Sequence, residues 1–303
     1  MKWLKKGLIY CPDGSSSWAK HSALTPTPIL LNDEVIRVYA SFRDHSGVGR
    51  IGYVDVDAEN PSTILKVSKK PVLDIGSPGT FDDNGVILGD VVKIADQLYM
   101  FYVGFQLVEK VKFLAFSGLA ISHDGGNTFT RIKQFPIMDR ADEGLYIRAI
   151  HSVLVEKNLV RVWYAAGNQW TWIGDKPYPS YEIRYMEANM DMLFGSSGRL
   201  CIKPQNDEYR IGRPRVYQTE NGYRMFYTWG NLHGGYMLGY AESKNGIEWK
   251  RFDAQVGIGL SENGWDSKSV CYPALLKYKD REYMFYNGND MGKTGFGYAV
   301  LSK

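Results

Sequence analysis

Residues 214–227 read Pro-Arg-Val-Tyr-Gln-Thr-Glu-Asn-Gly-Tyr-Arg-Met-Phe-Tyr. The stretch contains an apolar run, a polar turn and an aromatic run in succession. Asparagine and glycine tolerate the positive φ angles of tight hairpin turns, so Glu220-Asn221-Gly222 suits a hairpin connection. The aromatic and β-branched residues on either side favour strands. The stretch therefore predicts two antiparallel strands joined by a β-hairpin.

The same pattern occurs at four more places in the chain. The first strands are marked by corresponding residues at positions 28, 90, 152, 214 and 273, at intervals of 62, 62, 62 and 59 residues. A second-strand tyrosine follows at positions 39, 102, 164, 227 and 286, at intervals of 63, 62, 63 and 59. Because two independent markers agree, the chain has an internal repeat, which is the signature of a propeller or solenoid.

Each repeat also contains a third strand, and two repeats show a fourth. Four short antiparallel strands are the unit of a propeller blade. We therefore predict an all-β fold, a single five-bladed β-propeller over residues 1–303, and the regular repetition argues against a β-sandwich. The amino-terminal strand is expected to complete the fifth blade and close the ring, which would cover two sheet edges. The predicted blades span approximately residues 21–70, 81–135, 145–195, 208–255, and 266–303 together with 5–11.

Composition narrows the partners and the compartment. A formal net charge of +3 gives no support to a nucleic-acid or membrane partner. Three widely separated cysteines suit a reducing cytoplasm better than a disulfide framework. The amino terminus lacks an apolar segment of secretory length, and no apolar run is long enough to span a membrane. The five histidines lack metal-site spacing and no glycine-rich phosphate loop is present, so we expect a cytoplasmic protein with no cofactor and no bound metal.

One end of the predicted ring is chemically rich. The connections that follow the second strands, including residues 168–172, and those that lead into the first strands carry acids, amides, cations and indoles. Function often resides in loops on a rigid scaffold. Acids and amides can bond hydroxyl groups while aromatic faces stack on sugar rings, so the predicted partner is a saccharide or a sugar phosphate.

Three segments carry a family resemblance: residues 81–86 (Phe-Asp-Asp-Asn-Gly-Val), 265–270 (Trp-Asp-Ser-Lys-Ser-Val) and 283–288 (Tyr-Met-Phe-Tyr-Asn-Gly). Through them and the blade pattern, nearly the whole chain resembles the five-bladed propeller glycosidases of glycoside hydrolase families 43, 32 and 130. The resemblance implies a glycosidic bond cleaved by one acidic and one basic or nucleophilic carboxylate. In family 43 a catalytic aspartate often directly precedes the first strand. The residues at that place here are Thr27, Gly89, His151, Arg213 and Tyr272.

None of those five residues is acidic, so other carboxylates are the catalytic candidates. Asp90 stands at the channel wall where three other repeats have proline, and an acid there is costly unless it is paired or functional. We predict acid–base roles for Asp90, Asp83 and Glu143. Asp82 and Asp266 share an aromatic-Asp context, which favours a turn or capping role for both.

Basic residues near the first strands of the third and fourth repeats predict an anionic ligand, because guanidinium groups bind carboxylates and phosphates in a bidentate manner. Arg148, His151, Arg210, Arg213 and Arg215 make up this group. The alternative is that these arginines pair with acids at the rim. The predicted substrate-binding residues are Arg43, His21, Arg148, His151, Asn168, Trp170, Trp172, Arg213, His233, Asp266 and Tyr272.

Two functions remain open at the level of sequence. The first is a carbohydrate-active enzyme that cleaves or transfers a glycosidic or glycosyl-phosphate bond of an anionic saccharide or nucleotide sugar. The second is a non-catalytic glycan or nucleotide-sugar binding propeller. A carboxylate pair about 5–10 Å apart and facing the bowl would favour catalysis, whereas a bowl of arginines and amides would favour binding. A protein-interaction propeller, the third class, predicts a flat apolar top.

Overall fold

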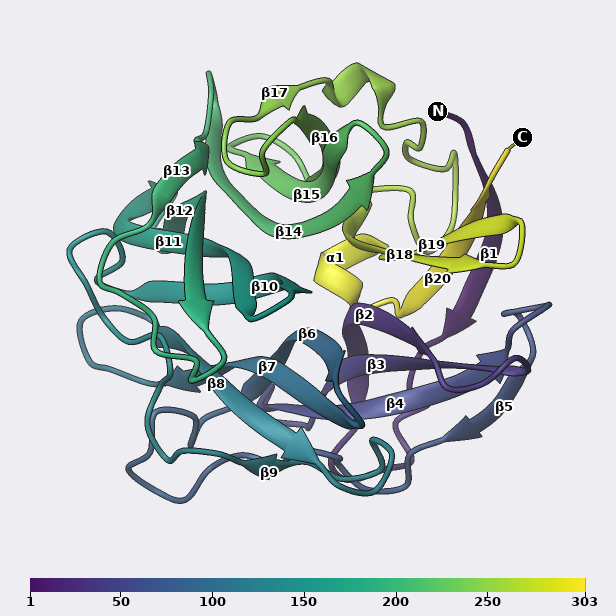
Figure 1. The fold of residues 1–303 in the computed structure, drawn as a ribbon, viewed down its shortest axis with the longest axis horizontal. Helices are drawn as coiled ribbons and strands as arrows, with labels where there is room; N and C mark the ends of the chain where they lie inside the picture. The colour runs from purple at the N-terminus through teal and green to yellow at the C-terminus, as the bar shows by residue number, and fades with distance from the viewer. Residues whose placement is uncertain (303) are drawn as a thin grey trace.

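The computed structural model describes residues 1–302, and Lys303, the last residue of the predicted fifth blade, lies outside the described residues. Strands make up nearly all of the regular structure, which confirms the predicted all-β class (Figure 1). The two helical segments are α1 (Asn289–Gly292) and the short 3-10 helix at Asp253–Gln255. Within residues 1–302, no helix has the length and apolar character to cross a membrane.

The strands form four sheets, three of four strands and one of eight. The first contains β2 (His21–Leu30), β3 (Val35–Arg43), β4 (Gly49–Asp57) and β5 (Ile64–Val67). The eight-stranded sheet contains β6 (Val86–Ile94), β7 (Gln97–Gln106), β8 (Leu114–Ser122), β9 (Thr130–Arg131), β10 (Ile147–Glu156), β11 (Leu159–Ile173), β12 (Lys176–Asn189) and β13 (Arg199–Ile202). The third contains β14 (Glu208–Thr219), β15 (Gly222–Asn231), β16 (Tyr236–Ser243) and β17 (Lys250–Arg251). The last contains β18 (Cys271–Tyr278), β19 (Arg281–Asn287), β20 (Phe296–Leu301) and β1 (Trp3–Tyr10).

The eight-stranded sheet joins two repeats that the sequence predicted as separate sheets. Strand β10 lies parallel to β8 and pairs with it over two residues, Ile147 with Ala115 and Arg148 with Phe116. On either side of this joint the strands are antiparallel and follow one another in chain order, β6 to β9 and β10 to β13. The short parallel pairing therefore changes the number of sheets while leaving the predicted four-stranded unit intact.

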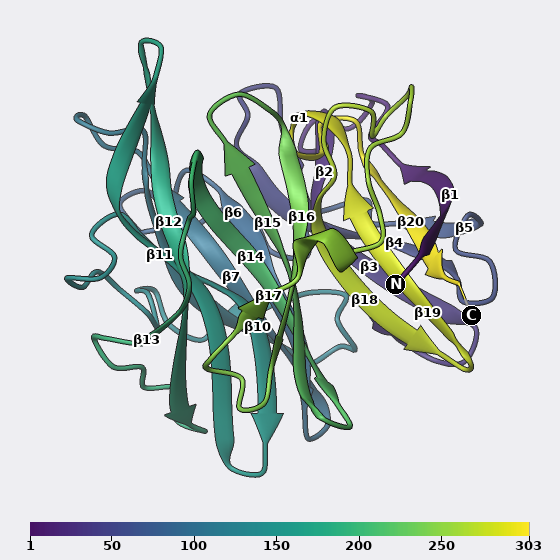
Figure 2. The same ribbon diagram turned by 90° about the horizontal axis from the view of Figure 1, so that it is seen from above.

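The first strand of each repeat lies toward the middle of the molecule, and these five are called the inner strands here: β2, β6, β10, β14 and β18 (Figure 1). The later strands lie farther out. The chain termini lie side by side because β1 pairs antiparallel with β20, as both views show (Figures 1 and 2). The sequence predicted this partner for the amino-terminal strand.

The apolar core lies between neighbouring sheets. Tyr39 of β3 packs with Met100 and Tyr102 of β7 in one cluster of buried residues. Phe42 of β3 packs with Phe285 of β19 in another, so the first and last sheets share a core. Most of the hydrophobic stabilisation therefore comes from contacts between repeats.

Glycines in third strands make room for the second-strand tyrosines. A Cβ atom on Gly118 would lie 2.2 Å from Cζ of Tyr102, and one on Gly239 would lie 2.1 Å from Cε2 of Tyr227. Both tyrosines are fully buried. Tyr102 and Tyr227 thus each require a residue without a side chain on the adjacent third strand.

Candidate functional site

A β-bulge interrupts every inner strand at a corresponding place. Gly89 is the extra residue in β6 and His151 the extra residue in β10. In β2, β14 and β18 the bulge falls at Thr25, Arg213 and Tyr272, each followed by proline. Proline cannot donate to a ladder and is tolerated at bulges, which explains why these three places depart from regular pairing. A bulge re-aims the side chain of its unpaired residue.

Three of these bulged residues have an unfavourable backbone. The φ angles are 58° at Thr25, 53° at Arg213 and 55° at Tyr272. Residues other than glycine rarely adopt positive φ, and such strain is found most often at functional sites. The strained positions belong to three different inner strands, and all three residues line the same cavity.

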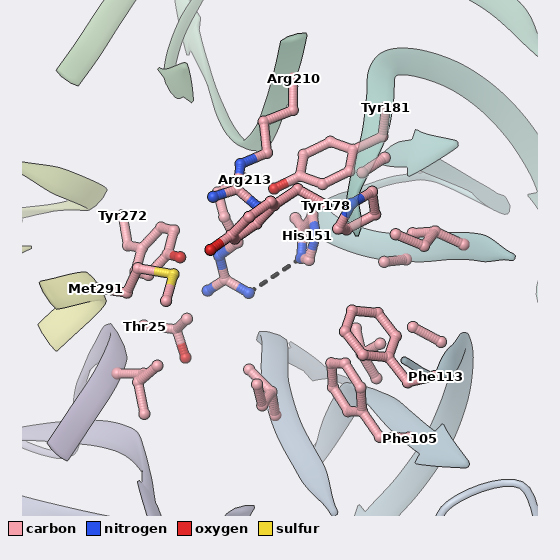
Figure 3. Close-up of a pocket in the computed structure, with 18 of the residues that line it drawn as sticks. Thr25, Phe105, Phe113, His151, Tyr178, Tyr181, Arg210, Arg213, Tyr272 and Met291 are labelled. Carbon is pink, nitrogen blue, oxygen red and sulfur yellow. Dashed lines mark hydrogen bonds between the residues drawn. The ribbon is translucent and has the colours of Figure 1, made fainter. Parts of the chain in front are cut away.

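The bulges face one cavity of about 330 Å³, within the usual range of ligand pockets (Figure 3). Thr25, His151, Arg213 and Tyr272 all line it. Its cations are Arg43, Lys112, Arg210 and Arg213. Its aromatic residues are Phe105, Phe113, Tyr178, Tyr181, Tyr236 and Tyr272. None of the described aspartates or glutamates lines this cavity, which we call the central pocket.

The arginines of the central pocket differ from the other arginines in lacking an acidic partner. Every other arginine that is buried or half-buried forms an ion pair with a carboxylate: Arg37, Arg50, Arg131, Arg148, Arg161, Arg184, Arg215, Arg224 and Arg251. Among residues 1–302, the arginines that are not exposed and have no ion pair are Arg43, Arg210 and Arg213. All three line the central pocket. Because a buried charge without a partner is costly, these three arginines distinguish the central pocket chemically from the rest of the described structure.

Arg213 and His151 are in direct contact at the pocket wall. Nη1 of Arg213 lies 3.0 Å from Nδ1 of His151 and also donates to the backbone oxygen of Leu88 (Figure 3). Guanidinium nitrogens only donate, so Nδ1 accepts and the neutral ring carries its proton on Nε2. Nε2 has no partner within residues 1–302. The ring can therefore donate a hydrogen bond to a ligand.

Arg210 lies among tyrosine rings. Its guanidinium carbon is 4.4 Å from the ring centroid of Tyr236, 4.6 Å from that of Tyr209, 5.9 Å from that of Tyr178 and 6.0 Å from that of Tyr181. Its Nε is buried with no acceptor in the described part of the chain. The rings hold the guanidinium by cation–π attraction and leave its N–H groups available to an anion.

The predicted catalytic carboxylates lie outside the central pocket. Asp90 is buried and accepts from Nη1 of Arg215 at 2.7 Å and from the backbone N–H groups of Val91 and Val153. Asp83 is half-buried in the loop before β6, where it accepts from the backbone N–H of Gly79 at 2.8 Å.

Glu143, the third predicted carboxylate, joins several elements. It pairs with Arg148 and Arg184, each at 3.1 Å, accepts from the backbone N–H of Gly198 at 2.8 Å, and receives the hydroxyl hydrogen of Tyr164. Arg148, predicted to bind substrate, is thereby turned away from the central pocket. No trio of His, Cys, Asp or Glu side chains within residues 1–302 could hold a metal ion.

Asp266 makes the same kind of contact as Asp82, as their shared sequence context suggested. Asp82 accepts from Nε of Arg131 on β9 at 2.7 Å. Asp266 accepts from Nζ of Lys5 on β1 at 2.6 Å and from the hydroxyl of Tyr286 at 2.9 Å. Each acid thus ties the loop before an inner strand to the outermost strand of the same repeat.

Of the predicted binding residues, Arg43, His151, Arg213 and Tyr272 line the central pocket. His233 lines an adjoining cavity of about 450 Å³ that shares Arg210 and Tyr236 with it. We call this the outer cavity. His21 lies outside both cavities, with Nδ1 2.8 Å from the hydroxyl of Ser22.

Residues 168–172 were expected in a loop, and that expectation was wrong. They continue β11 to Ile173, because Gln169, Trp170 and Trp172 pair with residues of β12. Asn168 is exposed and donates to the backbone oxygen of Asp142, while Trp172 is 67% exposed. Trp170 packs its ring 5.7 Å from that of Phe113, one layer outside the pocket wall.

Several pocket residues were missed by sequence reasoning. Tyr178 and Tyr181 reach the pocket because the β11–β12 hairpin is unusually long. Arg210 was grouped with the basic residues but was not chosen as a binding residue. Arg210 lies three residues before Arg213, between the loop that leads into β14 and the bulge of that strand. This position is the sequence signal that could have identified it as a binding residue.

No protein-family model matches the chain. The uncharacterized protein Rv1502 of Mycobacterium tuberculosis is 31% identical to it over 303 residues, which cover 99% of each protein. The chain belongs to the family of Rv1502. The match spans all of the repeats of this chain.

Solved structures of glycosidases resemble the chain along almost all of its length. One described as a glycoside hydrolase has a TM-score of 0.75 at 17% identity, covering 98% of this chain and 90% of that chain. A thermostable family-43 glycoside hydrolase has a TM-score of 0.67 at 14% identity, covering 94% and 90%. A third, from a description of the GH130 family of mannoside phosphorylases, has a TM-score of 0.72 at 14% identity, covering 99% and 93%. The chain shares the fold of these glycosidase structures, as the sequence resemblance predicted.

The central pocket should make stability sensitive to acid. Burial first, then the charges of Arg213 and Arg215, holds the pKa of His151 well below its ordinary value. Below about pH 6.5 the unfolded chain binds a proton at this residue and the folded protein does not, so stability falls with falling pH. We expect the difference in unfolding free energy between the native protein and His151→Gln to shrink by about 1.4 kcal/mol per pH unit below pH 6.5, until the folded pKa is reached. Urea denaturation from pH 7 to 5 measures it, and parallel pH profiles would contradict it.

Proposed function

We propose that the protein is a carbohydrate-active protein that binds an anionic saccharide, such as a sugar phosphate or a nucleotide sugar, in the central pocket. The observation that carries the proposal is the set of three arginines, Arg43, Arg210 and Arg213, which line one cavity without a carboxylate partner. Charge-assisted hydrogen bonds to an anion would offset the cost of burying these cations. The proton on Nε2 of His151 adds a neutral donor.

The saccharide part of the proposal is supported by the fold and by the outer cavity. Proteins described as glycoside hydrolases share this fold along nearly the whole chain. The outer cavity carries side chains that can bond hydroxyl groups, including Asn231, His233 and Ser269. Tyrosine faces at the junction of the two cavities can stack on a sugar ring.

Catalysis is the second candidate function, as an enzyme that cleaves or transfers a glycosidic or glycosyl-phosphate bond. The superfamily fold favours it, and Asp90 lies directly beneath the pocket wall, bonded to an arginine that also donates to the backbone oxygen of His151. His151 is the pocket-lining group able to move a proton. The acid–base roles of Asp90, Asp83 and Glu143 stay predictions. Unchanged turnover in Asp90→Asn would remove Asp90 from the mechanism.

The binding proposal is tested by isothermal titration with hexose 1-phosphates, nucleoside diphosphate sugars, uronic acids and neutral hexoses. At least one anionic compound should bind with a Kd below about 1 mM, and its binding should weaken at least about tenfold in Arg213→Met. Arg199→Met, which alters an exposed arginine far from the pocket lining, is the matched control and should bind as the native protein does. Preference for neutral hexoses, or undiminished binding by Arg213→Met, would refute the proposal.

We also infer that the strands form five blades in one closed ring, a single domain in which the inner strands surround the pocket. The pairing of β1 with β20 and the core shared by Phe42 and Phe285 support closure. A cytoplasmic location is part of the same proposal. Three cysteines without a disulfide, Cys11, Cys201 and Cys271, suit a reducing compartment.

A further inference from the structure

The central pocket has two chemically different ends. Arg210, Arg213 and Tyr272 lie together at one end, and Phe105 and Phe113 lie side by side at the other (Figure 3). His151 lies between the two groups in the same view. We call these the cationic end and the apolar end.

The apolar end is formed by small and aromatic side chains. Ala149 of β10 faces Ala165 of β11 in the strand ladder, and Ala115 of β8 pairs with Ile147 at the joint between the two repeats. All four are buried and line the pocket. Alanine at three adjacent places leaves space that larger side chains would fill, and the aromatic edge of Phe113 borders it.

A sugar ring does not suit this end. The walls given by Ala115, Ala149, Ala165, Phe105 and Phe113 offer no side-chain hydrogen-bond partner. A buried hydroxyl without a partner costs free energy, whereas an apolar or aromatic group gains from burial. An apolar cavity of about 150 Å³ holds one benzene ring. The 330 Å³ of the whole pocket therefore has room for one ring beside an anionic group.

The outer cavity adjoins the central pocket at Arg210. It shares Tyr178, Arg210, Tyr236 and Met291 with the central pocket. Its remaining walls carry the polar side chains of Asn231, His233, Lys268, Ser269 and Asp290 beside Ile173, Tyr209 and Leu232. Along the two cavities an apolar end, a cationic end and a polar cavity thus follow one another.

We infer that the ligand is an activated sugar, in which a phosphate or diphosphate joins a saccharide to an apolar or aromatic group. The sugar would occupy the outer cavity, the phosphate the cationic end, and the other group the apolar end. This inference rests on the proposed function and narrows it, because a simple sugar phosphate would leave the apolar end empty. A prenyl chain is such a group, whereas a nucleoside would place the hydroxyl groups of its ribose at the apolar end.

Small phosphates that contain no sugar test the inference whatever the sugar is. Isothermal titration with methyl phosphate and phenyl phosphate compares the same anion with and without a ring. Phenyl phosphate should bind at least about tenfold more tightly, since burying one ring removes a large apolar area from water. Isopentenyl phosphate should also bind more tightly than uridine monophosphate, and the reverse order would overturn the choice of a prenyl chain.

Two variants connect the effect to the apolar end. Ala149→Leu should abolish the preference for phenyl over methyl phosphate, because the leucine side chain occupies the space of the ring. Phe113→Ala, at the half-buried rim, should reduce the same preference and serves if Ala149→Leu gives little folded protein. Equal binding of methyl and phenyl phosphate, or an undiminished preference in both variants, would overturn the inference alone. Failure of every anionic compound to bind would instead refute the proposed function.

Discussion

Replacing Arg215 with methionine is expected to lower the free energy of unfolding by about 3–5 kcal/mol. Nη1 of Arg215 lies 2.7 Å from Oδ1 of Asp90, and both side chains are largely buried. The other donors to Asp90 are two backbone N–H groups, so methionine would remove the one cation that pairs with it within residues 1–302 and leave a buried carboxylate whose charge is not compensated. Urea denaturation at pH 7 measures the loss.

The same substitution two residues earlier should behave differently. Arg213 has no carboxylate to leave behind, and its side chain is held in a buried place by a carbonyl oxygen and an imidazole nitrogen. Burial first, then the charge of Arg215, holds the pKa of Arg213 below its ordinary value, which shows that the cation is disfavoured there. Arg213→Met should therefore change the unfolding free energy by less than about 1 kcal/mol, or raise it.

The contrast between the two variants distinguishes a structural arginine from a ligand-binding one. Arg215→Met should lose stability, whereas Arg213→Met should lose ligand binding. This pattern is typical of a functional site whose residues do not optimise stability. An equal loss of stability in both variants would show that Arg213 is part of the scaffold. The anionic ligand proposed for the central pocket would then lose its main support.

The strands could be predicted from the sequence because their signals are local. The hairpin at Glu220-Asn221-Gly222 and the tyrosines repeated about every sixty residues depend on neighbours in the chain, and β14 and β15 meet there as expected. The extension of β11 through Trp172 was not predictable in this way. It depends on cross-strand pairing with β12, and its polar and aromatic residues also suit a loop.

The candidate site was only partly predictable because it depends on distant partners. Arg210, Arg213 and Arg215 lie within six residues, yet one lies among tyrosines, one contacts His151 and one pairs with Asp90, 125 residues away. The bulge in β14 separates their directions, since it breaks the alternation of side chains along the strand. Proline after Thr25, Arg213 and Tyr272 was the local sign of those bulges.

The acids were misleading for a related reason. Asp266 and Lys5 are 261 residues apart in the chain and 2.6 Å apart in the structure. Acids in the loops before inner strands, for which the sequence favoured a turn or capping role, pair here with bases from outer strands, as at Asp82 and Arg131. Sequence alone gives the acids and the bases but not which of them meet.

Trp3→Ala is expected to lower the free energy of unfolding by about 3–5 kcal/mol, as truncation of large buried aromatic side chains usually does. Trp3 is 5% exposed, although it is the third residue of the chain. Its ring packs edge-on against Phe226 of β15 at 6.2 Å, in a cluster that also contains Leu238 and Ile258. Its backbone pairs with Leu301 of β20. The side chain therefore joins the closing strand to the sheet of the fourth repeat as well as to its own.

Leu4→Ala is the matched control, because Leu4 is the next residue on the same strand and is 44% exposed. Its loss should be within about 0.5 kcal/mol. If both variants lost equally little stability, the pairing of β1 with β20 would contribute little to the free energy of unfolding. If Trp3→Ala alone is severe, the strand that carries Lys5, the partner of Asp266, contributes to the stability of both the fourth and the fifth repeats.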